Sequence, residues 1–225
     1  MWLMVPSARW TEADAVLADF GGRERAVSTR LALLSVAGGL AFRRGEARVS
    51  KQLLEELRPL ALASGELQRI VPMAAVVLPW LARTGELEDL RSLTNEILAV
   101  VNGKWPAVLD AVPVGRALAA AGETELLART TESIRETPDL AANAQTAQIA
   151  AEGLLALLQG RAGDAIEQLE RATERERQLG RSYPSACLEL DLAQALEAAG
   201  REDAASEVRA RAAAVLEPLG CVNPF

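Results

Sequence analysis

The stretch Leu154–Ala172, LLALLQGRAGDAIEQLERA, decides the fold. It predicts one helix that ends in a turn at Gly160 and a second helix that begins near Asp164, because glycine readily adopts the left-handed conformation that ends a helix. Small residues fall where two antiparallel helices must approach each other closely, namely at Gly153, Ala165 and Ala172. The stretch therefore predicts a tightly packed helix pair.

The same spacing recurs along the whole chain. The glycines expected to end the first helix of each pair are Gly45, Gly85, Gly122, Gly160 and Gly200. Their intervals are 40, 37, 38 and 40 residues. The residue seven positions earlier is small in four of the five units, at Gly38, Gly115, Gly153 and Ala193. This regularity predicts a solenoid, in which each pair buries its apolar face against the next.

The repeated pattern resembles a known family. A small residue seven positions before the glycine, followed by G-x4-A-x6-A, is similar to the tetratricopeptide repeat, and residues 146–179 match all four of its small positions. The longer repeats, rich in Ala, Leu and Arg, also resemble those in the C-terminal parts of large bacterial LuxR-type regulators and class III nucleotide cyclases. The resemblance implies an all-α, right-handed α-solenoid of antiparallel helix pairs.

We expect one helical repeat domain over residues 1–225, with about 11 helices. A partial repeat with a lone helix is expected within residues 1–22. The helix pairs are expected at residues 26–60, 67–101, 106–136, 142–178 and 184–217. Pro106 suits the first position of a helix, whereas Pro79 and Pro113 should kink or shorten their helices, because each removes an intrahelical hydrogen bond.

The start of the chain is unusually apolar. Trp2, Leu3, Met4, Val5 and Trp10 lie close together in the sequence, with no capping helix before them. These residues either fold back as a cap, or face a partner or an upstream repeat. A second copy of the chain is one such partner, so a homo-oligomer through this apolar N-terminus is an open alternative.

Charge and hydropathy exclude several classes of function. The net charge is −7, and phosphate binding needs clustered Lys or Arg, so we expect no direct contact with nucleic acid. The longest apolar stretches, Leu31–Phe42 and Ile70–Ala82, fall short of the roughly 18 residues that span a membrane. Two cysteines form no disulfide framework, which favours a reducing cytoplasm as the location.

The residue types needed for catalysis are missing or scattered. The sequence has no histidine, which excludes Ser-His-Asp and Cys-His pairs and removes the commonest metal ligand. Cys187 and Cys221 are too isolated in sequence for a zinc site, and no phosphate-binding glycine motif is present. Paired carboxylates such as Glu55 and Glu56 are expected on solvated helix surfaces. We therefore expect no enzymatic activity, no metal and no cofactor.

A binding surface is expected where the first helices of the pairs line the concave side of the solenoid. Positions counted back from each turn glycine, with nearby arginines, give the groove candidates Ser35, Phe42, Arg43, Arg83, Arg116, Leu154, Leu157, Gln194 and Glu197. Arg43, Arg83 and Arg116 either form a basic ladder for a peptide carboxylate or are ordinary exposed arginines. Leu154 and Leu157 belong either to an apolar groove or to the core.

The function expected from the sequence is a non-catalytic scaffold that binds a protein or peptide, or a sensory module, in a bacterial signalling or transcription regulator. Its mechanism would be recognition of a partner segment in the concave groove. The alternative is a helical domain that binds a small-molecule effector and controls a linked ATPase, cyclase or DNA-binding domain. An enclosed cavity would favour the effector, and a broad groove would favour the scaffold.

Overall fold

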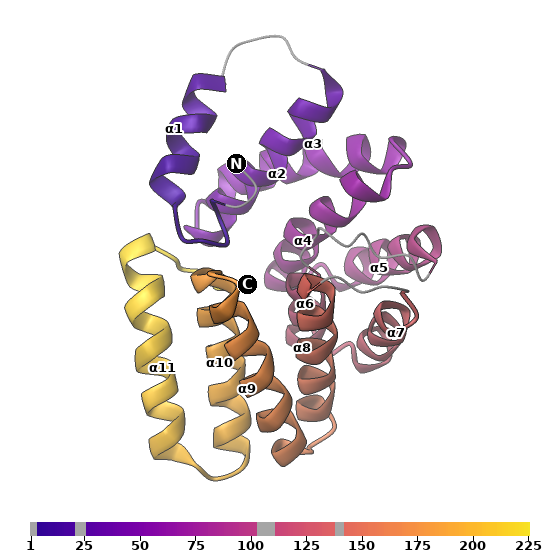
Figure 1. Ribbon diagram of the computed structural model, residues 1–225. Helices are drawn as coiled ribbons and strands as arrows, with labels where there is room; N and C mark the ends of the chain where they lie inside the picture. The colour runs from indigo at the N-terminus through magenta and orange to yellow at the C-terminus, as the bar shows by residue number, and fades with distance from the viewer. Residues whose placement is uncertain (1–3, 21–25, 103–110, 138–141) are drawn as a thin grey trace.

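Helices account for all the regular secondary structure that the computed structural model describes, which covers residues 4–20, 26–102, 111–137 and 142–225 (Figure 1). Over these residues there are eleven α-helices and one short 3-10 helix, and no strand. The expectation of an all-α fold with about 11 helices is therefore confirmed.

The helices follow one another with short connections. Their bounds are α1 (Trp10–Phe20), α2 (Val27–Arg43), α3 (Ala47–Ala63), α4 (Leu67–Thr84), α5 (Leu87–Val101), α6 (Val112–Ala120), α7 (Thr124–Arg135), α8 (Ala142–Leu158), α9 (Ala162–Gln178), α10 (Ser182–Ala198), α11 (Glu202–Leu216) and the 3-10 helix η1 (Glu217–Leu219). The predicted start of a helix at Pro106 lies outside the described residues.

The turns within the pairs are built alike. The five expected turn glycines all have a left-handed backbone, with φ between 71° and 78°. The residue after each glycine donates its N–H to the carbonyl five positions earlier, as Arg161 does to Ala156 at 2.9 Å. These bonds satisfy carbonyl groups that the end of a helix leaves unpaired. The predicted turns are confirmed at all five positions.

The pairs stack in chain order. Helices α2, α4, α6, α8 and α10 form an inner row, in which each helix contacts the next. Each is followed by a partner on the outside, so that α3, α5, α7, α9 and α11 pack against the inner helix that precedes them (Figure 1). Among the described residues, no helix is both long and apolar enough to cross a membrane. The right-handed sense of the coil stays a prediction.

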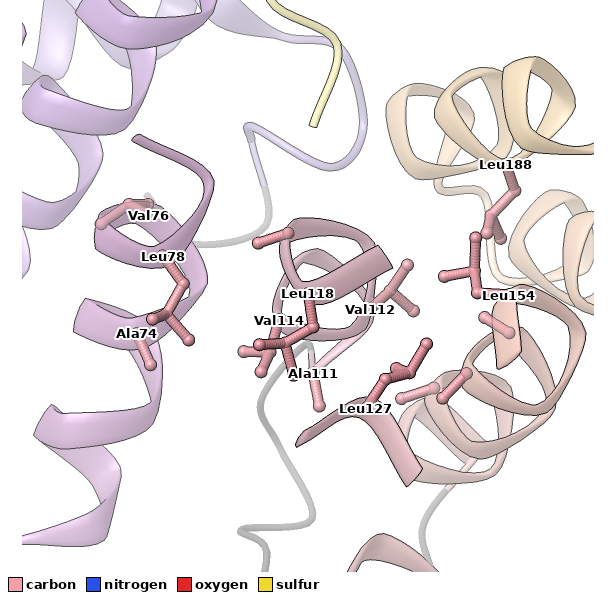
Figure 2. Close-up of a cluster of buried hydrophobic side chains, with 14 of the residues drawn as sticks. Ala74, Val76, Leu78, Ala111, Val112, Val114, Leu118, Leu127, Leu154 and Leu188 are labelled. Atoms are coloured by element: carbon pink, nitrogen blue, oxygen red, sulfur yellow. The ribbon is translucent and has the colours of Figure 1, made fainter. Parts of the chain in front are cut away.

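The core runs continuously along the inner row. Figure 2 shows Val114 and Leu118 of α6 between Leu78 of α4 on one side and Leu127 and Leu154 on the other. All five side chains are buried. Short Leu, Val and Ala side chains fill this layer, because closely stacked helices leave little room for aromatic rings.

Proline affects the two middle pairs differently. Pro79 lies inside α4, which nevertheless continues as far as Thr84. Pro113 lies in the first turn of α6, because that helix begins only at Val112. A proline there removes no intrahelical bond, so Pro113 lies at the start of its helix and not inside it, and the expectation of a shortened helix fits the nine residues of α6.

A small residue lies seven positions before the turn glycine in four of the five units, and at Gly38 and Gly153 it allows the two helices of the pair to touch. A Cβ atom added at Gly153 of α8 would lie 2.9 Å from Cγ of Leu169 in α9, and one at Gly38 would lie 2.7 Å from Cδ2 of Leu54. Both distances are shorter than carbon atoms tolerate. Gly163, near the start of α9, has no such neighbour within 4 Å.

Gly153→Ala should lower the free energy of unfolding by about 1–3 kcal/mol through overpacking, although alanine is the better helix former. For a domain of this size, the melting temperature should fall by about 2–4 °C per kcal/mol. Gly163→Ala is the matched control and should leave the melting temperature unchanged or slightly higher. Thermal unfolding followed by circular dichroism measures both, and a stabilised Gly153→Ala variant would contradict the close contact.

The two ends of the stack meet. Trp10 is buried and its Nε1 donates to the carbonyl of Val5 at 3.2 Å, while the N–H of Tyr183 in α10 donates to the carbonyl of Pro6 at 3.1 Å. The Trp10 and Tyr183 rings lie edge to face, with centroids 5.3 Å apart. The interpretation that the apolar N-terminus folds back is thus confirmed for Met4, Val5 and Trp10, whereas Trp2 and Leu3 lie outside the described residues.

This closure forms a second hydrophobic cluster, separate from the main core. Its buried members are Trp10, Ala13, Val36, Leu40, Tyr183, Ala186, Cys187, Ala212 and Leu216, which come from α1, α2, α10 and α11. Arg44, after α2, also bonds to Asp14 of α1 through two hydrogen bonds of 3.0 and 2.6 Å. The first and last pairs are therefore joined, and α2 faces α10 across the centre of the molecule.

Candidate binding site

Five polar side chains gather where α2, α6 and α10 face one another, and we call them the central cluster. They are Arg43 of α2, Arg116 of α6, and Tyr183, Cys187 and Asp191 of α10. Each is less than 9% exposed. The three residues of α10 are four positions apart, so the helical repeat places them on one face.

The strongest interaction in the central cluster is a two-pronged ion pair. Nε of Arg116 donates to Oδ2 of Asp191 at 2.5 Å, and Nη2 donates to Oδ1 at 2.9 Å. Burial alone would lower the pKa of Arg116, but the attraction of the Asp191 carboxylate outweighs it and leaves this pKa raised. The pair holds the guanidinium in one orientation, with Nη1 left to contact other groups.

Arg43 is held in a different way. Its Nε donates to the hydroxyl of Tyr183 at 2.9 Å, and its guanidinium lies 5.1 Å from the centre of the Tyr183 ring. No carboxylate within the described part of the chain forms an ion pair with it. Gly39, one turn earlier, leaves room for this group, since a Cβ there would lie 2.7 Å from Nη1. Because the charge of Arg43 is buried with a hydroxyl as its hydrogen-bond partner, carbonyl oxygens placed near it are stabilised.

Residues 221–225, Cys-Val-Asn-Pro-Phe, enter this space, and we call them the inserted segment. The N–H groups of Val222 and Asn223 donate to the carbonyl of Arg43 at 2.7 and 3.0 Å. The side-chain amide of Asn223 donates to the carbonyl of Phe42 at 2.7 Å. Both acceptors lie in the last turn of α2, where the carbonyl of Phe42 also accepts from the N–H of Gly45 at 3.0 Å.

The other half of the inserted segment is bound by side chains of the central cluster. Nη1 of Arg116 donates to the carbonyl of Pro224 at 2.7 Å. The hydroxyl of Tyr183 donates to the carbonyl of Phe225 at 2.6 Å. Burial is the main cause that raises the pKa of Tyr183 well above its usual value, so the hydroxyl keeps the proton that it donates.

We call the surface of α2, α6 and α10 that binds the inserted segment the groove. The ring of Phe225 contacts Phe42 and Arg116 there. It lies 5.8 Å from the ring of Phe42, and the Arg116 guanidinium lies 5.8 Å from its centre on a cation–π contact. A cavity of about 40 Å³ remains beside it, lined by residues that include Val5, Pro6, Arg43 and Tyr183. This volume is far below the roughly 300–1,000 Å³ of pockets that hold small organic ligands.

The structure brings three of the predicted groove residues together. Phe42, Arg43 and Arg116 all contact the inserted segment. Arg83 is exposed on α4 and lies outside the central cluster, so only two arginines of the predicted ladder meet.

The remaining candidates lie elsewhere. Ser35 is buried and its Oγ donates to the carbonyl of Leu31 at 2.9 Å, one turn earlier in α2. Leu154 and Leu157 pack in or against the core. Gln194 is exposed, and Glu197 forms a surface ion pair with Arg209. None of these five side chains lines the cavity beside Phe225.

Sequence reasoning missed Tyr183, Cys187, Asp191 and the inserted segment. In the repeat pattern, the groove positions are counted back from Gly200, which gives Gln194 and Glu197. These two residues lie nearer the C-terminal end of α10 than Tyr183, Cys187 and Asp191. A signal did exist: polar or titratable side chains recur every four positions in a helix that is otherwise apolar on that face. Within the described residues, no three metal-ligating side chains gather to hold a metal ion.

Comparison with known proteins identifies no family. No protein-family model matches the chain, and no curated protein matches it either. The likeness to the tetratricopeptide repeat and to the repeats of LuxR-type regulators and class III nucleotide cyclases therefore stays a prediction from the repeat pattern.

Cys221 should react slowly with alkylating reagents while the inserted segment is in place. Burial, the largest cause, raises the pKa of Cys221 from an ordinary value near 9 to about 11, because a low-dielectric site disfavours the thiolate. At pH 8 the thiolate fraction, and with it the rate, should be about 100-fold lower than for an unshifted thiol. Iodoacetamide labelling resolved by mass spectrometry measures this rate, with the chain unfolded in guanidinium as the reference. Equal rates in the two states would contradict the burial of Cys221.

Proposed function

We propose that this chain is a non-catalytic scaffold that binds a short segment of a partner protein at the centre of its helix stack. The observation that carries the proposal is the inserted segment, which is bound through four of its backbone groups by α2, α6 and α10. Backbone recognition of this kind accepts a peptide from any source.

The geometry favours a peptide over a small effector. The donors and acceptors around the central cluster contact successive backbone groups of the inserted segment, from Val222 to Phe225. The cavity that remains is too small for an organic ligand. A net charge of −7 supports a protein partner rather than nucleic acid.

The resemblance of the repeats supports a role in a particular kind of protein. Helical repeats of this composition resemble those of bacterial signalling and transcription regulators, so we propose that the chain serves there as an interaction or sensory module in the cytoplasm. In such a role it recognises a partner and carries out no chemistry of its own. Whether it pairs with a second copy is decided by the measurements below.

Selection from a displayed library of random peptides tests the proposal. The bait is the full chain with Phe225→Ala, which loosens the inserted segment and exposes the groove. Selected peptides are then measured against the same bait carrying Tyr183→Phe, which removes the hydroxyl donor and keeps the ring. We expect peptides whose affinity falls at least tenfold with Tyr183→Phe, as the loss of a buried hydrogen bond predicts.

Arg209→Ala, on the surface of α11, is the control substitution and should leave peptide affinity unchanged. The proposal fails if no selected peptide depends on Tyr183. It also fails if every selected peptide binds equally well to a chain whose groove still holds an intact inserted segment, because the binding surface would then lie elsewhere.

A further inference from the structure

We infer that the groove selects partner segments with the sequence Asn-Pro-aromatic, and that residues 221–225 are a built-in competitor that must leave before the partner binds. This inference rests on the proposed function and adds the ligand class and its regulation. Some contacts of the inserted segment can be made by any peptide, whereas others need a particular side chain.

The asparagine is read by its side chain. Nδ2 of Asn223 donates to the carbonyl of Phe42 at 2.7 Å while its backbone N–H donates to the carbonyl of Arg43 at 3.0 Å. Two donors spaced like these match two adjacent carbonyl groups at the end of α2. An aspartate side chain at this position would offer only acceptors to the carbonyl of Phe42, so the groove favours the amide.

The proline sets the shape. The N–H of Phe225 donates back to the carbonyl of Asn223 at 3.0 Å, which closes a tight turn around Pro224. Proline is prepared for such a turn because its ring fixes φ near −65°, so less entropy is lost on binding. The turn also points the Pro224 carbonyl at Arg116, which donates to it at 2.7 Å.

The aromatic ring completes the motif. Phe225 contacts the Phe42 ring and the Arg116 guanidinium at 5.8 Å each, and both surfaces suit the face of an aromatic side chain. Val222, by contrast, is 64% exposed, so its side chain contributes little to selection.

Contacts outside the inserted segment orient the side chains that bind it. Asp191 orients Arg116, and Arg43 orients the hydroxyl of Tyr183. All five residues of the segment keep some exposure to solvent, whereas the side chains that bind it are buried. The segment can therefore leave without separating the helices, and its departure removes the two hydrogen bonds that the carbonyl of Arg43 accepts from Val222 and Asn223.

A partner must displace the inserted segment, which is covalently connected to the groove. A segment connected by the few residues after η1 has an effective concentration in the millimolar range, so it lowers the apparent affinity of any free peptide. A partner that carries the same three side chains meets the same contacts, and additional contacts outside the motif are what allow it to win.

The test uses the full chain and a fluorescent peptide, Gly-Ser-Val-Asn-Pro-Phe, with an amidated end. Fluorescence anisotropy compares wild type with the full chain carrying Asn223→Ala and Phe225→Ala. We expect the peptide to bind the double variant at least tenfold more tightly than wild type. Peptides with Asn→Asp or Phe→Ala should bind the double variant at least tenfold more weakly than the parent peptide.

Alkylation of Cys221 gives a second measurement that needs no variant. Saturating peptide should raise the labelling rate of Cys221 in the wild-type chain at least tenfold, because displacement of the inserted segment exposes this thiol. Labelling of Cys187, which is buried on α10, should stay unchanged and serves as the internal control.

Several outcomes would overturn the inference. Equal affinity for wild type and double variant would exclude the built-in competitor. Groove-dependent peptides from the library that lack Asn-Pro-aromatic, with no binding of the motif peptide, would refute the motif and leave the proposed function standing. A wild-type dimer that dissociates on Phe225→Ala, measured by light scattering, would show that the natural occupant is the segment of a second copy.

Discussion

Asp191→Ala should lower the free energy of unfolding by about 3–5 kcal/mol, because it leaves the Arg116 guanidinium buried and without its carboxylate. Both side chains are less than 10% exposed, so water cannot replace the lost partner. The effect should be larger than that of most single substitutions, which cost about 1 kcal/mol. Urea unfolding followed by circular dichroism measures the loss.

Arg209→Ala is the matched control for that result. Arg209 pairs with Glu197, but both side chains are more than one-third exposed, and such pairs contribute at most about 1 kcal/mol. A double replacement, Arg116→Met with Asp191→Leu, should recover much of the stability, since removal of both charges leaves none unpaired. The same double variant should still lose the Arg116 contact to the inserted segment, which separates stability from binding. A cost below 1 kcal/mol for Asp191→Ala would mean that the pair is solvated.

Trp10→Ala should cost about 3–5 kcal/mol, the usual range for truncating a buried aromatic side chain to alanine. Trp10 is 2% exposed and packs on Tyr183, so its loss removes a buried aromatic contact between α1 and α10. We expect hydrogen exchange to accelerate first in α1 and at the N–H of Tyr183, which bonds to Pro6.

Val49→Ala in α3 is the control for Trp10, because Val49 is 47% exposed and its truncation should change stability by less than about 0.5 kcal/mol. A uniform loss of protection against hydrogen exchange in all helices would contradict a local opening between α1 and α10. A small effect on both stability and exchange would mean that the two ends are not held together by this contact.

The repeats of the fold could be predicted because they obey one local rule. A glycine with positive φ ends the first helix in all five units, and a small residue seven positions earlier, present in four of them, favours close packing. The pair expected over 142–178 coincides with α8 and α9 for this reason. Of the pair expected over 106–136, the structure describes α6 from Val112 and α7, and the expected start at Pro106 lies outside the described residues.

The sequence predicted only part of the candidate site. The other part depends on the contact between the N-terminal residues and α10, which no repeat pattern indicates. Phe42, Arg43 and Arg116 followed from counting positions within a repeat. Tyr183 and Asp191 did not, because the N-terminal residues attach to α10 and bring a different register of that helix to the centre. No periodic pattern marks the inserted segment, which follows the last helix and contacts residues about 180 positions earlier in the chain.

Joining the first and last pairs also fixes how long this array can be. An open solenoid tolerates the gain or loss of a unit, because each unit contacts only its neighbours. Here the deletion of one middle unit, or the duplication of another, would shift α10 along the coil and separate Asp191 from Arg116 and Tyr183 from Arg43. Evolution by unit duplication, common among repeat proteins, is therefore closed to this molecule unless the binding centre is rebuilt at the same time.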